Sequence, residues 1–413
     1  MLARAGRYAL PAVSETRRLE LERALLEHRA LFLRRFGGDG PVRLWFSPGR
    51  VNLMGAHLDY NGGPVMPTAI DRGTFLALRP RSDGRIQLAS TLELGELELE
   101  AGDLPLQPAR RWWDYPVGVL RELSAHSGRL GRPVAGFDLL FGGNLPVGAG
   151  LSSSASICVG TALALSETWG LCLPRLELVQ VALAAERGFV GVQCGIMDPY
   201  AVGLARAGSL LWLDCKDGSN AWMPLDPELH TIAVADTLVR RELAQSAFNE
   251  RVRQCAQAFA ELAPHQPGAT CLRDIRLETL EARRGELDPL LARRAEHVLR
   301  EVARTFAARD ALLRGDLAGF GAQMTRAHAS LRTLFDVSVP ELDTLVDAAV
   351  GCEGVLGARL TGAGFGGCVV VLLRRGAEPE LLARVQNAFG ARFGRAPTVE
   401  FFGGDEGPRE FRP

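Results

Sequence analysis

The chain has 413 residues, 47% of them hydrophobic, and a formal net charge of −1 at neutral pH. This length and apolar content are enough to bury the cores of two domains, and the balanced charge leaves no basic excess to offset nucleic-acid phosphates. We therefore expect no nucleic-acid partner and, because no apolar run reaches the roughly 20 residues of a membrane span, no membrane partner.

The first hundred residues predict one helix and then several strands. Residues 14–36 have helical spacing, with Ser14 as a cap and Gly37-Gly38 as the end. Segments that alternate with the period of a strand follow: residues 42–55, 74–81, 85–90 and 92–104. An Asp83-Gly84 turn predicts that the second and third of these strands form a hairpin.

Helices dominate the rest of the chain. The segments with the length and apolar period of helices are residues 114–126, 153–170, 173–191, about 240–260 and 288–313. A strand at the start of residues 136–150 enters a glycine-rich loop, and a second such loop runs into the strand 368–373. The chain turns polar near Asp217, so we expect domains at 1–216 and 217–413, and the mixture of elements predicts an α+β protein.

None of the eight cysteines forms a C-x-x-C pair, and most lie among apolar residues. We expect buried, reduced thiols in a cytoplasmic protein and no zinc site, because no cluster of ligands is present. The N-terminus lacks the apolar core of a signal peptide, which favours the same location. We further expect a monomer or weak oligomer.

The segment from Leu145 to Ser156, LPVGAGLSSSAS, has the composition of an anion-binding loop. Its two glycines permit a tight turn, and three serines follow where a helix should start. Free N–H groups at a helix start attract anions, and a serine hydroxyl there can bind Mg²⁺. A serine-capped helix after a glycine turn would give the same pattern without any ligand.

A second loop, TGAGFGG from Thr361 to Gly367, contains G-x-G-x-x-G. A dinucleotide fingerprint must follow a strand and open a helix, whereas a strand follows here, so a glycine-rich hairpin is an equal interpretation. A conventional P-loop and a protein kinase both need a suitably placed lysine. The only lysine, Lys216, lies in neither context, so a nucleotide would have to be held by backbone amides, Mg²⁺ and arginine.

These two loops and a third segment, PGRVNLMGAHLDYNGG from Pro48 to Gly63, occur in one order along the chain. Together they resemble the three signature motifs of the galactokinase branch of the GHMP kinases, and the likeness extends over nearly the whole chain. The resemblance implies a two-domain α+β GHMP kinase fold. Its N-terminal domain would be like ribosomal protein S5 domain 2 and its C-terminal domain ferredoxin-like, with the active site between them.

The resemblance also implies an activity, an ATP-dependent sugar 1-kinase with galactose as its small-molecule substrate and Mg²⁺ as its metal. Asp198 falls on the family's catalytic base, and Arg50 on the arginine beside it. The implied sugar contacts are position 56, His57, Asp59, Gly195 and position 248. The implied phosphate loop comprises Pro146, Gly148, Ala149, Gly150, Leu151, Ser152, Ser153 and Ser154. The implied Mg²⁺ ligands are Ser154 and Glu186.

Several residues depart from the family pattern. Ala56 stands where family members have a glutamate next to the sugar's C6 hydroxyl, and Phe248 stands where they have a tyrosine. Pro199, Asp114 and Ala363 also differ and are expected to be tolerated. Removing a carboxylate opens space and removes negative charge.

These departures leave alternatives open. Plant galacturonate kinases of the same branch have an alanine at the place of Ala56, so galacturonate is an alternative substrate, with Arg240 or Arg241 as the counter-charge. An alternative of another class is a catalytically silent sugar sensor, against which the retained Arg50 and Asp198 argue. A small-molecule kinase such as mevalonate kinase fits the sugar loop less well.

Overall fold

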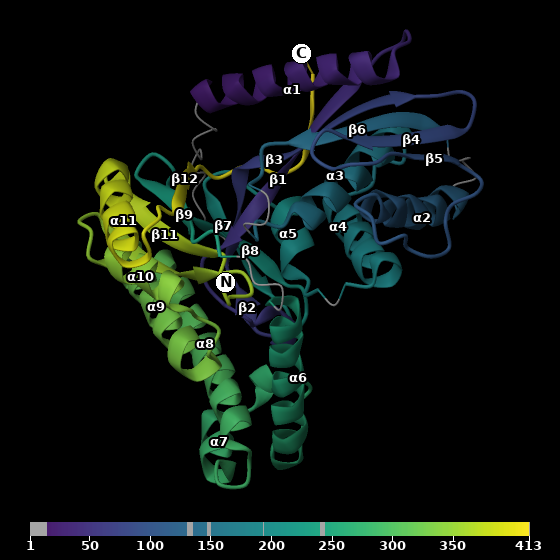
Figure 1. Cartoon of the computed structure of the whole chain (residues 1–413). Helices are drawn as coiled ribbons and strands as arrows, with labels where there is room; N and C mark the ends of the chain where they lie inside the picture. Colours follow the sequence, from purple (N-terminus) through teal and green to yellow (C-terminus); the bar gives the residue numbers. More distant parts are fainter. Residues whose placement is uncertain (1–14, 130–134, 147–149, 193, 240–243, 413) are drawn as a thin grey trace.

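The structure is a computed structural model that describes residues 15–129, 135–146, 150–192, 194–239 and 244–412. Its upper half, as drawn in Figure 1, is built on a six-stranded sheet with the strand order β13-β1-β3-β6-β4-β5. These strands are β1 (Arg43–Asn52), β3 (Pro67–Pro80), β4 (Arg85–Ser90), β5 (Leu97–Glu100), β6 (Phe137–Gly143) and β13 (Arg409–Phe411). The last strand of the chain therefore completes the sheet that the first strand begins.

The alternation of side chains along β1 and β3 determines what packs on each face of this sheet. Leu44, Phe46 and Phe75 face α1 (Glu15–Phe36), which crosses the top of the sheet in Figure 1. Trp45 and its neighbours face the helices α2 (Asp114–Arg129), α3 (Ser153–Thr168) and α4 (Arg175–Ala184). The predicted helix end is confirmed, since Gly37 and Gly38 both have positive φ.

The predicted hairpin between β3 and β4 is wrong. β6 lies between them, antiparallel to β3 and parallel to β4. Six of the seven residues of β6 are buried, whereas β4 alternates between buried and more exposed positions. β6, which is more buried than β4, lies between β3 and β4, where both of its faces are covered.

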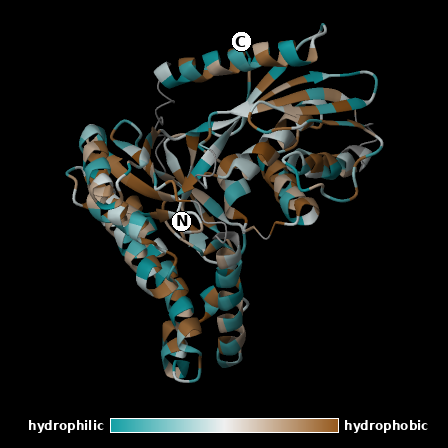
Figure 2. Ribbon diagram, in the orientation of Figure 1, coloured by the Kyte–Doolittle hydropathy of each residue, from teal (hydrophilic) through white to brown (hydrophobic). Residues whose placement is uncertain are grey.

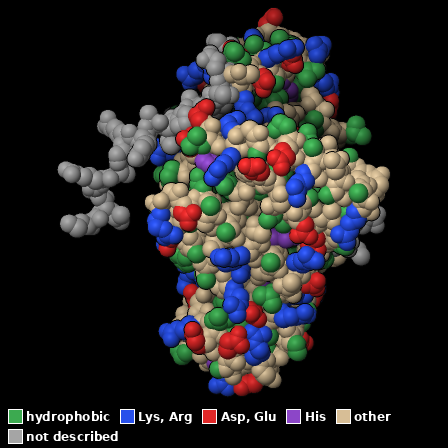
Figure 3. Space-filling view, turned by 90° about the vertical axis from the view of Figure 1, so that its left-hand side faces the viewer, with side chains coloured by type: hydrophobic (Ala, Val, Ile, Leu, Met, Phe, Trp, Pro, Cys, Tyr) green, Lys and Arg blue, Asp and Glu red, His purple; other side chains and the backbone are tan. Residues whose placement is uncertain are grey.

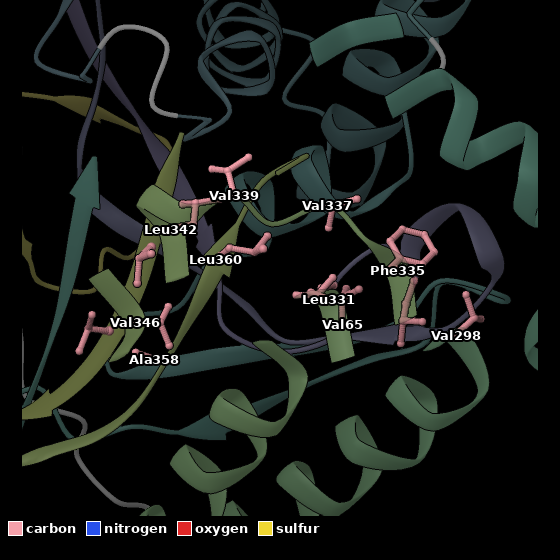
Figure 4. Packing of buried hydrophobic residues seen from close by; sticks show 14 of the residues in the cluster. Val65, Val298, Leu331, Phe335, Val337, Val339, Leu342, Val346, Ala358 and Leu360 are labelled. Carbon is pink, nitrogen blue, oxygen red and sulfur yellow. The ribbon is translucent and has the colours of Figure 1, made fainter. Parts of the chain in front are cut away.

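The second half is built on a four-stranded sheet with the order β10-β11-β9-β12. Its strands are β9 (His230–Asp236), β10 (Val355–Thr361), β11 (Cys368–Arg374) and β12 (Thr398–Phe402). The helices of this half are α6 (Ala244–Leu262), α7 (Leu277–Arg283), α8 (Pro289–Leu313), α9 (Leu317–Ser330), α10 (Pro340–Val350) and α11 (Glu378–Phe393). Figure 4 shows Leu360 and Ala358 of β10 packed among apolar side chains of these helices.

A small third sheet joins the two halves. It consists of β2 (Pro64–Val65), β7 (Ser209–Asp214) and β8 (Asn220–Pro224). Its side chains share an apolar cluster with the end of β1, with β9 and β11, and with α9. In Figure 2 brown stretches alternate with white and teal ones along the strands of both large sheets, and the helices also carry many teal residues.

Short helical segments complete the chain, and several border the cavity described below. They are the 3₁₀ turns Asp59–Asn61, Ala263–His265 and Leu272–Asp274, the π-helical segments Ala185–Val190 and Leu331–Phe335, and the helix α5 (Met197–Gly203). No helix among the described residues is both long and apolar enough to span a membrane.

The surface and the cysteines agree with part of the sequence analysis. On the face drawn in Figure 3, basic and acidic side chains are interspersed, in keeping with the near-zero net charge. None of the eight cysteines, all of which lie within the described residues, forms a disulfide. The expectation of buried thiols is only partly correct, since Cys158, Cys255, Cys352 and Cys368 are buried but Cys172 is exposed.

A buried ion pair under α1 gives a test of the fold. The carboxylate of Asp138 on β6 is fully buried and binds Arg79 at 2.6 Å and Arg81 at 2.9 Å. Asp138→Ala leaves the buried Arg79 guanidinium without its counter-charge, which should cost about 3 kcal/mol or more in the free energy of unfolding. Urea titration followed by circular dichroism measures this.

Asp83→Ala is the matched control. Asp83 binds the same Arg81, but half of its side chain is exposed to solvent, so its loss should leave the urea midpoint nearly unchanged. Equal midpoints for the two variants would contradict the importance given to the buried pair.

Candidate active site

A cavity of about 260 Å³ lies where the two halves meet. Its wall comes from the end of β1, from the sugar-loop motif that follows, from residue 192 and residues within 194–198, from α6, and from β10 with its glycine loop. Elements that are distant in sequence thus contribute to one concave surface. Cavities between two halves of a chain are the usual place for small-molecule sites.

Arg50 and Asp198 form a bidentate ion pair on this wall. Arg50 Nε donates to Asp198 Oδ1 and Arg50 Nη2 donates to Asp198 Oδ2, both at 2.8 Å. The Arg50 side chain is 8% exposed and that of Asp198 is 28% exposed. Paired hydrogen bonds between planar groups fix orientation as well as charge. The carboxylate is therefore held in one orientation and remains open to the cavity.

The glycine-serine loop is attached to the same arginine. Arg50 Nη1 donates to the carbonyl of Gly150 at 2.7 Å, and the Arg50 amide donates to the carbonyl of Leu151 at 3.0 Å. This approach requires a glycine at position 49, since a Cβ there would lie 2.8 Å from the Leu151 carbonyl oxygen. The Ser152 hydroxyl donates to Asp198 Oδ2, a contact that the sequence did not indicate.

The predicted phosphate loop is only partly described. Gly148 and Ala149 lie outside the described residues. Ser152 precedes the first turn of α3 with a left-handed backbone, φ 60°. Leu151 is buried in an apolar cluster, while Ser153 is exposed. A role for Leu151 in binding phosphate could therefore come only from its backbone.

Asp59 and Gly195 approach each other closely. A Cβ on Gly195 would lie 1.9 Å from Asp59 Oδ2, so only glycine fits beside this carboxyl group. Burial, together with the negative charge of the nearby Asp198 carboxylate, raises the pKa of Asp59 to about 6. Both residues line the cavity.

His57 lies deeper in the wall. Its Nδ1 is 2.9 Å from the Tyr60 hydroxyl, and its ring packs 4.7 Å from that of Phe335 and 5.9 Å from that of Phe248. Burial lowers its pKa to about 3, with the charges of His297 and Arg359 acting in the same direction. The ring is therefore neutral, and its buried Nε2 has no hydrogen-bond partner.

Ala56 and Phe248 also line the cavity, which places both departures from the family pattern at the predicted site. The counter-charge proposed for galacturonate, Arg240 or Arg241, lies outside the described residues.

The sequence analysis missed part of this wall. Arg359 borders the cavity together with Thr361 and Ala363 of the TGAGFGG loop, although that loop was interpreted only as a ligand-binding loop or a hairpin. Arg359 is 1% exposed, and burial lowers its pKa to about 10. Its position directly before the glycine loop was the available signal.

Glu186 and Ser154 lie next to the cavity rather than on its wall. The Ser154 hydroxyl binds the Glu186 carboxyl group, and burial raises the pKa of Glu186 to about 7. The second carboxyl oxygen of Glu186, Oε2, is buried without a hydrogen-bond partner. Glu186 belongs to the π-helical segment that continues α4, and such segments often mark functional sites.

Family models match three parts of the chain. Residues 30–80 match the galactokinase galactose-binding signature, residues 114–206 the GHMP kinases N terminal domain and residues 308–392 the GHMP kinases C terminal model. The galactokinase of Clostridium beijerinckii is 37% identical over 89% of this chain and 94% of that protein. The human galactokinase is 38% identical over 91% of this chain and 94% of that protein.

The chain belongs to the galactokinase family of GHMP kinases.

Solved structures agree with the family. The structure of Lactococcus lactis galactokinase complexed with galactose superposes with a TM-score of 0.87 at 32% identity, covering 94% of this chain and all of that one. The Methanococcus jannaschii mevalonate kinase, at 20% identity and a TM-score of 0.63, shares the fold alone. The predicted two-domain GHMP kinase fold and the predicted kinase activity are confirmed.

The two carboxyl groups in the cavity generate a prediction. Asp59 should titrate near pH 6, so that it is protonated below and ionised above that value. Asp198→Asn removes a neighbouring negative charge and should lower the pKa of Asp59. Carboxyl ¹³C NMR measures the pKa of Asp59 in the wild type and in Asp198→Asn. Asp217→Asn, at an exposed turn, serves as the control. An unchanged pKa in Asp198→Asn would show that burial alone raises it.

Proposed function

We propose that this protein is an ATP-dependent galactose 1-kinase. The observation that carries the proposal is Asp198, oriented by Arg50 on the wall of a cavity that both halves form beside the glycine-serine loop. The family assigns ATP as the phosphoryl donor, and the relatives reported above are galactokinases. A screen of ATP consumption with galactose, galacturonate, N-acetylgalactosamine, glucose and arabinose, followed by ³¹P NMR of the product, tests it.

In this proposal Asp198 is the general base. Its carboxylate accepts the proton of the anomeric hydroxyl as that oxygen attacks the γ-phosphorus, and the bond from the γ-phosphorus to the ADP oxygen breaks. Arg50 keeps the carboxylate oriented through two hydrogen bonds, and its charge would lie where the transferred phosphoryl group passes. The two members of one ion pair would thus share the work: Asp198 accepts the proton, and Arg50 positions the phosphoryl group.

Asp59, His57 and Gly195 would bind the sugar. An ionised Asp59 accepts hydrogen bonds from hydroxyl groups, and the unpartnered Nε2 of neutral His57 offers a further polar contact. Gly195 leaves room for Asp59 to lie on the wall. The aromatic rings of Phe248 and Phe335 surround His57 and exclude water from one side of it.

Mg²⁺ is implied by the family, and the residues present fit it. Glu186 offers a buried oxygen without a partner, and Ser154 offers the hydroxyl that binds the same carboxyl group. Both are the oxygen ligands that Mg²⁺ prefers. No cluster of three His, Cys, Asp or Glu side chains suited to a metal occurs in the described part of the chain, so nucleotide phosphates and water would complete the coordination. A bound Mg²⁺ would neutralise phosphate charge.

The alternatives considered from sequence are less well supported. The named relatives are galactokinases, so Ala56 alone does not favour galacturonate as the substrate. A silent sensor would have no need for an ion-paired carboxylate that is open to the cavity. Turnover of galactose in preference to galacturonate would decide against both alternatives.

Asp198→Asn tests the proposed base. Removal of the proton acceptor should lower kcat for galactose by a factor on the order of 10² or more in a variant that still folds. Steady-state kinetics with a coupled ADP assay measures this, and Asp217→Asn is the control. Near-normal turnover by a folded Asp198→Asn would reject the assignment.

Glu186→Gln and Ser154→Ala test the proposed metal ligands. Loss of either oxygen ligand should raise the Mg²⁺ concentration needed for half-maximal rate by about tenfold or more. The control is Glu177→Gln, an exposed carboxylate in the first turn of α4, the helix that leads into the Glu186 segment. If neither variant differs from this control, the metal site lies elsewhere.

A further inference from the structure

The backbone of Ala56 is held on both sides by one helix of the second half. The Ala56 amide donates to Glu301 Oε1 at 3.2 Å, and the Ala56 carbonyl oxygen lies 3.4 Å from His297 Nε2. Glu301 and His297 both belong to α8 and are fully buried. They are four residues apart, so they lie on one face of the helix.

The two side chains are themselves fixed. Arg304 Nε donates to Glu301 Oε2 at 2.7 Å, which leaves Oε1 to accept from Ala56. His297 Nδ1 lies 2.9 Å from the Ser330 hydroxyl. Because a carbonyl oxygen can only accept, Nε2 of the neutral ring carries the proton and Nδ1 accepts from Ser330.

The residue after Ala56 has a strained backbone. His57 has φ 58°, a left-handed conformation that costs free energy in a residue with a side chain. Asn61 Nδ2 donates to the His57 carbonyl at 2.8 Å, and the Phe335 ring lies between the rings of His57 and His297, at 4.7 and 4.5 Å. The α8 side chains thus contact the residue directly before the strained one. Figure 4 shows Phe335 among the packed side chains of this region.

We propose that Glu301, assisted by His297, is a positioning residue for the sugar site. It fixes the Ala56 peptide groups, and through them it keeps His57 and Asp59 facing the cavity. Neither α8 side chain is among the cavity-lining residues, whereas Ala56, His57 and Asp59 are. Glu301 therefore acts on the sugar only through the loop, and this inference rests on the proposed galactose kinase activity.

The consequences of replacing Glu301 follow from its two partners. Glu301→Ala leaves the buried Ala56 amide without an acceptor and Arg304 without its carboxylate. Glu301→Gln keeps an acceptor oxygen for Ala56 but loses the charge that binds Arg304. The loop should then be freer to leave the conformation that binds sugar, and the loss should be larger for alanine than for glutamine.

The test separates sugar binding from catalysis. Steady-state kinetics and calorimetric titration with galactose are measured for wild type, Glu301→Ala and Glu301→Gln. We expect Glu301→Ala to raise KM and Kd for galactose by about tenfold, Glu301→Gln to raise both less, and kcat and KM for ATP to stay within about threefold. If Glu301→Ala fails to fold, Glu301→Gln alone still has to raise Kd.

The matched control is Leu291→Ala. Leu291 is buried on the same helix and in the same apolar cluster as Ala56 and Phe335, but no hydrogen bond joins its side chain to the sugar loop. Leu291→Ala should lower the thermal midpoint without raising KM for galactose.

Equal increases in galactose Kd for Leu291→Ala and Glu301→Ala at equal loss of thermal stability would overturn the positioning role, since destabilisation alone would then explain the effect. An unchanged Kd in both Glu301 variants would overturn it as well. A wild-type protein that does not turn over galactose would instead contradict the proposed function, and direct titration of the sugar distinguishes the two cases.

Discussion

The geometry of the site depends on the hydrogen bonds that the buried guanidinium of Arg359 makes. Its nitrogens donate to the carbonyls of Leu53, Asn52 and Leu360 at 2.7, 2.5 and 2.9 Å. A cation removed from water is costly unless every donor finds an acceptor, so the end of β1 and the strand β10 can adopt few other relative positions. The two halves must therefore meet where these carbonyls converge.

The rest of the site follows from that junction. The end of β1 carries Arg50, which orients Asp198 and holds the glycine-serine loop through the Gly150 carbonyl. The loop after β1 contacts Glu301 and His297 of α8 through the backbone of Ala56. The second half therefore helps to fix a loop of the first half. Few of these contacts are apolar, which makes the site a polar network whose members depend on one another.

The sequence predicted elements with strong local periodicity and residues within motifs. α2, α3 and α8 appeared where the spacing indicated, and the motifs drew attention to Arg50, Asp59 and Asp198, which line one cavity. The β3–β4 hairpin was wrong because strand pairing depends on a distant segment, β6, that competes for the inner position. Glu301 was missed because nothing local distinguishes a buried charged residue from the many exposed ones, and Arg359 was missed because its one local signal is its position two residues before the TGAGFGG loop.

The pairing of β13 with β1 has a consequence for synthesis of the chain. Leu44, Trp45 and Phe46 pair with Phe411, Glu410 and Arg409, so contacts of nearly maximal sequence separation complete the first sheet. Loop closure over such a distance is slow, and on the ribosome β1 remains an apolar edge strand until β13 emerges. Unpaired edges of this kind recruit other chains. The nascent protein therefore depends on β13 to protect β1 from aggregation.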